Sequence, residues 1–129
     1  MLRVGPYANR EAEVRDTWRR GIAAVAACGN LIMKLGGLGL PRAGFGWHTR
    51  QKPVGSVELA EAMAPWMTYC IEQCGPTRCM FESNFPVDKG SFSHHVLYNA
   101  FERVSQGYAA AARAALFHDT AARVYRINV

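Results

Sequence analysis

The 129-residue sequence lacks the features that would mark a membrane, secreted or disordered protein. Its longest apolar run, residues 21–33, contains Gly29 and Asn30 and is shorter than the roughly 18 uncharged residues that a membrane span needs. Residues 1–10 hold neither a basic leader followed by an apolar stretch nor a small-residue cleavage site. No block of Ser, Gln, Pro or like charge predicts disorder. We expect one globular domain over residues 1–129, cytoplasmic and without membrane contact.

Basic residues and cysteines are present, but their spacing does not indicate a nucleic-acid or zinc site. The net charge is +5, yet Arg15, Arg19 and Arg20 share their segment with acidic residues and the other basic residues are scattered. We therefore expect no nucleic-acid partner. The four cysteines include no C-x-x-C pair, and no histidine stands at zinc-finger spacing. Cys28, among apolar neighbours like most of the others, is expected to be a buried free thiol, and no structural zinc is predicted.

The predicted order of elements is helix, strand, helix, strand, helix. Val14, Trp18 and Ile22 recur at the four-residue spacing of a helix, and "LIMKL" is a nearly continuous apolar run, typical of a strand covered on both faces. Alternation without a hairpin signal predicts parallel βα units, joined here by a glycine-rich loop of about 20 residues. The expected elements are helix 8–28, strand 31–35, helix 56–73 with Ser56 as its cap, strand 78–83, a helix from Ser91 or Ser93 to about 105, and one or two closing helices.

These two strands predict an α/β fold that is incomplete by itself. Two parallel strands do not form a sheet that can stand alone, and both strands are apolar enough to need neighbours and covering helices. The chain therefore has the pattern of the end of a larger α/β domain. Strand 31–35 is expected to pair with strand 78–83 in parallel.

Polar side chains gather at the end of the second strand. In "RCMFESNFPVDK" the two-residue period places Met80, Glu82 and Asn84 on the face opposite Phe81, and Asp88 follows in the loop. The carboxyl ends of parallel strands and the loops after them form the active sites of α/β folds. We therefore predict Glu82, Asn84 and Asp88 as candidate catalytic residues.

The first strand and its loop supply candidate substrate contacts. The same period turns Lys34 toward the face of Glu82, and an unpaired buried charge loses several kcal/mol of hydration, so the two should pair. Whether the pair is structural or contacts substrate stays open. Trp47 and His48 lie on the glycine-rich loop and are predicted substrate contacts, with packing an equal alternative for Trp47.

Several stretches together resemble the carboxyl-terminal part of the amidohydrolase-related family, nearest its lactonase-like branch. They are "LIMKLGGLGL", "GFGWH", "CIEQCGPTRCMFESNFPVDK", "YNAFERV" and "LFHDTAARVYRI". The resemblance implies a (β/α)8 TIM barrel in which residues 31–35 and 78–83 are strands seven and eight. It also implies a hydrolase that acts on a small molecule with a lactone, amide or related C–O or C–N bond. Some members use a divalent metal, so the cofactor is left unknown, and no metal site is expected from this chain alone.

The sequence departs from that family at the end of strand eight. The family commonly has G-S-D or G-T-D there, and its aspartate activates water. Here Glu82, Ser83 and Asn84 stand at those positions. An amide does not accept a proton at neutral pH, so Asn84 would orient the reacting group, and Glu82 or Asp88 would take the proton.

Two functions stay open. The chain is either the terminal part of a hydrolase barrel, completed by further sequence, by a second copy or by another polypeptide, or a non-catalytic truncated fragment or interaction module with exposed apolar faces. Strands one to six, with the H-x-H pair that the resemblance implies, are absent. We therefore expect the chain alone to be inactive.

Overall fold

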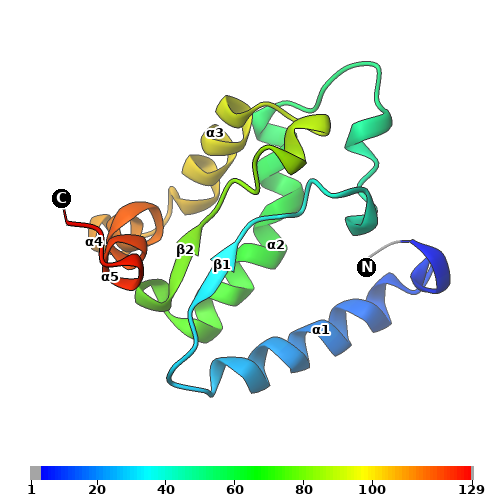
Figure 1. Cartoon of the computed structure of the whole chain (residues 1–129). Coiled ribbons are helices and arrows are strands. Elements are labelled where there is room, and N and C mark those ends of the chain that lie inside the picture. Colours follow the sequence, from blue (N-terminus) through cyan, green and yellow to red (C-terminus); the bar gives the residue numbers. More distant parts are fainter. Residues whose placement is uncertain (1–3, 129) are drawn as a thin grey trace.

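The structure, a computed structural model, describes residues 4–128. It contains a sheet of two strands with helices packed around it (Figure 1). The helix α2 crosses behind both strands, α1 lies on the β1 side, and α3, α4 and α5 lie on the β2 side (Figure 1). The elements are α1 Glu11–Ala26, β1 Met33–Leu35, α2 Ser56–Cys74, β2 Cys79–Phe81, α3 His94–Ser105, α4 Ala110–Ala114, a π-helical segment Ala115–Asp119, and α5 Thr120–Tyr125.

The two strands pair in parallel, as predicted, with Met33 opposite Cys79, Lys34 opposite Met80 and Leu35 opposite Phe81. Each strand is three residues long, shorter than expected. Within residues 4–128 each strand has one strand neighbour, so the sheet has two open edges. Each strand is short because, within the described residues, it forms backbone hydrogen bonds with a neighbouring strand on one side only.

One face of the sheet is covered by helices. Leu35 and Cys79 are buried there, and Phe81 stacks on Phe101 of α3 with ring centroids 4.4 Å apart. Phe117 of the π-helical segment packs against Phe81 at 4.9 Å. The core between the sheet, α2 and α3 is built from fully buried side chains that include Leu59, Met63, Ile71, Leu97 and Phe101. This core fixes the strands, and with them the loops that follow their carboxyl ends.

Serines mark the starts of two helices, as expected, but in different ways. Ser93 caps α3, because its hydroxyl accepts a hydrogen bond from the backbone N–H of Val96 at 3.2 Å. Ser56 is instead the first helical residue of α2, after Gly55, and its hydroxyl accepts a hydrogen bond from Arg103 at 3.3 Å. The predicted cap at Ser56 is therefore wrong, although the predicted helix is confirmed. No helix within residues 4–128 has the length and apolar character that a membrane crossing requires.

Arg78, just before β2, joins the carboxyl ends of α1 and α2. Its guanidinium donates to the carbonyl of Cys74 at 2.7 Å, of Cys28 at 3.0 Å and of Ala26 at 3.1 Å. Ala26 and Cys74 are the last residues of α1 and α2, where intrahelical donors run out, and Cys28 lies in the turn after α1. A single cation therefore ties together the two helices that flank β1.

We expect Arg78→Ala to lower the free energy of unfolding by about 2 kcal/mol, because hydrogen bonds from a charged donor are lost and the helix-end carbonyls lose their partner. Urea denaturation followed by circular dichroism measures the change. The control is Arg42→Ala on an exposed turn, which should stay within about 0.5 kcal/mol of the original protein. Equal effects of the two substitutions would contradict this role of Arg78.

Candidate functional site

Lys34 of β1 and Glu82, directly after β2, form an ion pair with Nζ and Oε2 2.7 Å apart. The predicted pairing is therefore confirmed, on the face opposite the one where Phe81 packs on α3. The hydrogen bond and the charge of Glu82 raise the pKa of Lys34 above its ordinary value. The pair is less enclosed than expected, with 49% of the Lys34 side chain and 28% of the Glu82 side chain exposed.

The loop after β1 passes very close to the loop after β2. A Cβ atom on Gly36 would lie 2.4 Å from the carbonyl oxygen of Glu82, and one on Gly39 would lie 2.7 Å from Cγ of Asp88. Side chains other than hydrogen do not fit at such distances. The glycines of "GGLG" were predicted as part of a glycine-rich loop, and their role in close packing was missed. The two post-strand loops therefore form one unit.

Asp88 is at the centre of that unit. It is 1% exposed, its Oδ2 accepts the backbone N–H of Gly39 at 3.1 Å, and its Oδ1 accepts the side-chain amide of Asn84 at 2.8 Å. Ser91 adds a hydrogen bond from its hydroxyl to the carbonyl of Gly39 at 2.6 Å. We call Gly39, Asn84, Asp88 and Ser91 the Asp88 cluster.

The environment of Asp88 differs from that of a proton acceptor open to substrate. Burial raises the pKa of Asp88, and the hydrogen bonds from Asn84 and Gly39 oppose this effect. Both carboxylate oxygens already accept hydrogen bonds from within the chain. Of the two carboxylates predicted as proton acceptors, Glu82 is thus the more accessible. A catalytic role for Asn84, Glu82 or Asp88 stays a prediction.

Trp47 and His48 share one short 3-10 turn, Trp47–Thr49, but differ in burial. Trp47 is 4% exposed, stacks on Phe45 with centroids 4.4 Å apart and meets Phe92 edge to face at 5.8 Å. This environment supports the packing alternative for Trp47. His48 is exposed. No hydrogen bond or ion pair within residues 4–128 joins either side chain to the Lys34–Glu82 pair or the Asp88 cluster, and their contact with substrate stays a prediction.

The cysteines are free thiols. Cys70, Cys74 and Cys79 are buried. Burial raises the pKa of Cys70 to about 11 and that of Cys79 to about 12, which keeps the thiols of Cys70 and Cys79 protonated and unreactive. Cys28 is exposed, contrary to expectation, because it lies in the turn after α1 rather than on the buried face of the helix. Within residues 4–128 no group of three His, Cys, Asp or Glu side chains could hold a metal ion.

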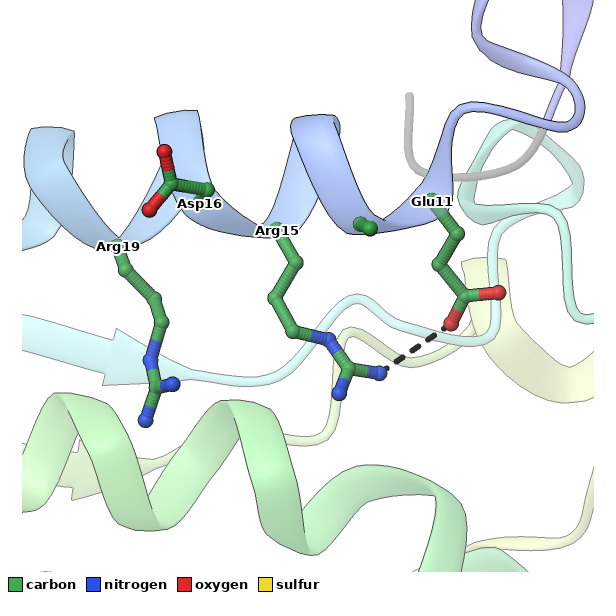
Figure 2. A pocket seen from close by; sticks show the side chains of 5 residues that line it. Glu11, Arg15, Asp16 and Arg19 are labelled. Atoms are coloured by element: carbon green, nitrogen blue, oxygen red, sulfur yellow. Dashed lines mark hydrogen bonds and ion pairs between the residues drawn. The ribbon is translucent and has the colours of Figure 1, made fainter.

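A surface pocket of about 500 Å³ lies along α1 (Figure 2). Arg15 and Arg19 point from α1 toward α2, and Arg15 pairs with Glu11 at 3.2 Å (Figure 2). The guanidinium of Arg15 lies 5.4 Å from the ring centroid of Trp66, and that of Arg19 lies 4.4 Å from the ring centroid of Tyr69. Both arginines thus contribute cation–π contacts that pack α1 on α2. The mixed charges of this pocket do not define a ligand.

A second cavity, of about 160 Å³, lies at the edge of β1 that faces away from β2. Its lining is mostly apolar and comes from α1, β1 and α2, including Trp18, Ile22, Met33, Trp66 and Met67. An open strand edge offers unpaired backbone groups, and the cavity beside it offers apolar contact. The edge therefore has the properties of a surface on which another strand could pack.

Parallel strands, helices on one face and polar groups at the carboxyl ends define this chain as part of an α/β domain. The amidohydrolase family model matches residues 5–127, and the chain belongs to this family. The predicted recognition of the family is thereby confirmed. The pattern of two βα units agrees with part of an amidohydrolase TIM barrel.

Known proteins similar to the chain are considerably longer. The uncharacterized protein y4mH of Sinorhizobium fredii is 34% identical over 112 residues, which make up 87% of this chain and 33% of that protein. A crystal structure of an amidohydrolase from Burkholderia multivorans with bound HEPES matches with a TM-score of 0.79 and 26% identity, over 93% of this chain and 40% of that one. A second crystal form of the same amidohydrolase, with bound zinc, gives a TM-score of 0.76 and 26% identity over 90% and 39%. The chain thus spans about a third of the curated relative.

Proposed function

We propose that this chain supplies strands seven and eight, and the loops after them, to the active site of a lactonase-like amidohydrolase barrel. The reaction is hydrolysis of a lactone, an amide or a related C–O or C–N bond in a small molecule. The observation that carries the proposal is the Lys34–Glu82 pair, which places a carboxylate and an ammonium group at the carboxyl ends of adjacent parallel strands.

The residues divide the chemical work as follows. Glu82 takes a proton from water, whose oxygen attacks the substrate carbonyl carbon, and the C–O or C–N bond breaks as the leaving group gains a proton. Lys34 orients Glu82 through the 2.7 Å contact and attracts a substrate oxygen. Asn84 orients the reacting group by hydrogen bonding. His48 contacts substrate from the rim, and Trp47 supports the loop that carries it.

A metal, if the complete barrel uses one, would take its ligands mainly from outside this chain, because residues 4–128 do not assemble three ligands by themselves. Glu82 is the partly exposed carboxylate that could join such a set. The roles given above are those of this chain's own groups, and the rest of the barrel would supply the remaining catalytic groups.

A second candidate function is that of a non-catalytic interaction module. The open edge of β1 and the 160 Å³ apolar cavity beside it favour this alternative. In both functions the partner is a polypeptide that adds a strand in parallel to β1, either the remaining part of the barrel or a second copy of the chain. A cytoplasmic location and the absence of a nucleic-acid partner stay predictions.

The proposal is tested by assaying the 129-residue chain alone and as a fusion with the part of the Burkholderia amidohydrolase outside the matched region. Release of acid from a panel of lactones and amides measures hydrolysis. We expect no hydrolysis by the chain alone and an increase of several powers of ten in the fusion, because cooperating catalytic groups lose nearly all activity when one part is absent.

Assembly must be measured before activity. Gel filtration and circular dichroism show whether the fusion is folded and monodisperse. A folded fusion without hydrolysis on any substrate would favour the interaction module, and equal rates for the chain alone and the fusion would contradict its role as part of a barrel.

A further inference from the structure

The Asp88 cluster fixes the orientation of the Asn84 side-chain amide, which the sequence alone does not show. Asn84 has a left-handed backbone conformation, with φ of 52°, and its backbone carbonyl accepts the N–H of Asp88 at 3.1 Å. Its position is thus fixed by the turn that carries both residues. The remaining freedom of Asn84 is which end of its amide faces Asp88.

The chemistry of Asp88 decides that question. Oδ2 of Asp88 already accepts the Gly39 N–H, and Oδ1 faces the amide of Asn84 at 2.8 Å. Two such donors satisfy an ionised carboxylate, which accepts hydrogen bonds and donates none. The amide end toward Asp88 is accordingly the NH2 group, which donates to Oδ1, since an oxygen facing an ionised carboxylate would have no proton to share with it.

The carbonyl oxygen of Asn84 consequently points away from Asp88. Asn84 is half-buried, and none of the hydrogen bonds formed among residues 4–128 uses this oxygen. A half-buried amide oxygen accepts hydrogen bonds from a donor and repels an oxyanion. The amide oxygen of Asn84 therefore favours a hydrogen-bond donor over an oxyanion as its neighbour.

We propose that Asp88 is a positioning residue that holds Asn84 with its carbonyl oxygen toward the site, so that the group bound there is a hydrogen-bond donor, a hydroxyl or a water molecule. This assignment of the ligand group rests on the proposed hydrolase function, whereas the orientation of the amide rests on the Asp88 cluster alone. In the hydrolytic reaction, Asn84 then holds water or a substrate hydroxyl and does not stabilise an oxyanion.

Asp88→Asn gives a matched test because it keeps the shape of the side chain and changes one acceptor into a donor. The Gly39 N–H cannot turn, so the oxygen of residue 88 should stay with Gly39 and its new NH2 group should face Asn84. Asn84 must then rotate its amide to accept. Its NH2 group, protected in the original protein, becomes exposed to the site.

Hydrogen exchange of the Asn84 side-chain NH2, followed by 15N NMR on the 129-residue chain, reports this rotation. We expect exchange to be at least tenfold faster in Asp88→Asn than in the original chain, while the Gly39 amide stays protected. Unchanged exchange at Asn84 in a folded Asp88→Asn chain would overturn the proposal.

In Asp88→Asn the two rotated amides form a hydrogen bond between neutral groups, whereas the double variant Asn84→Asp with Asp88→Asn restores a carboxylate as the acceptor, with donor and acceptor exchanged. It should regain stability that Asp88→Asn loses, and the NH2 group at position 88 should be protected. Thermal unfolding measures the recovery even where Asp88→Asn alone fails to fold, and a double variant no more stable than the single one overturns the proposal.

Neither readout uses a substrate. The expected exchange pattern together with an inactive completed barrel would contradict the proposed hydrolase and leave the orientation of Asn84 standing. An active completed barrel without the exchange pattern would remove Asp88 as a positioning residue and leave the hydrolase.

Discussion

Replacing Gly36 with alanine should lower the free energy of unfolding by about 3 kcal/mol, or prevent folding altogether. The added methyl carbon would lie 2.4 Å from both Cγ and the backbone oxygen of Glu82. The side chain of Glu82 could rotate, but its backbone is held in place because its N–H donates to the carbonyl of Leu35 at 3.1 Å. Either the two loops separate or the pairing of β1 with β2 is lost. Urea denaturation followed by circular dichroism measures the effect.

Gly21→Ala is the matched control for this substitution. Gly21 lies inside α1, where a Cβ atom would meet nothing within 4 Å. Alanine is the better helix former, so this variant should be more stable than the original chain by roughly 1 kcal/mol. If Gly36→Ala were as stable as Gly21→Ala, the close approach of the two loops would be wrong, and with it the compact unit that holds the Asp88 cluster.

The sheet and the charged pair were predictable because they depend on local periodicity. Strand residues alternate between faces, so the sequence alone placed Lys34 and Glu82 on one side and Phe81 on the other. The cost of burying an unpaired charge then predicted their contact. Both inferences need only the identity and the spacing of residues within each strand, and the structure confirms them.

The Asp88 cluster was not predictable in the same way. Gly39 and Asp88 are 49 residues apart in sequence, and no periodic pattern states that their loops meet. Asp88 was predicted as a candidate proton acceptor from its place after a strand, and its enclosure in hydrogen bonds was not foreseen. The burial of Trp47 follows likewise from rings on other segments, Phe45 and Phe92. The sequence features that could have indicated the Asp88 cluster are the glycine-rich loop after the first strand and a serine close to Asp88.

We expect Glu82→Gln in the completed barrel to reduce kcat by a factor of roughly 10²–10⁴, the usual contribution of a proton acceptor. Glutamine keeps the size of the side chain and a hydrogen-bond acceptor for Lys34, but it does not take a proton from water. KM should change little, because the lost interaction belongs to the proton transfer and not to the binding of substrate. Steady-state kinetics on the substrate that the completed barrel hydrolyses best measures both constants.

Glu58→Gln is the control that distinguishes loss of proton transfer by Glu82 from loss of a surface ion pair. Glu58 pairs with Arg50 at 2.6 Å, close to the 2.7 Å of the Lys34–Glu82 pair, but it lies in the first turn of α2. Both pairs are substantially exposed, so each substitution should cost less than about 1 kcal/mol of stability, and only Glu82→Gln should lower kcat. If Glu82→Gln kept full kcat in a folded protein, the Lys34–Glu82 pair would be a structural link between the strands. The proton acceptor would then have to come from the rest of the barrel, since both oxygens of Asp88 are already occupied by Gly39 and Asn84.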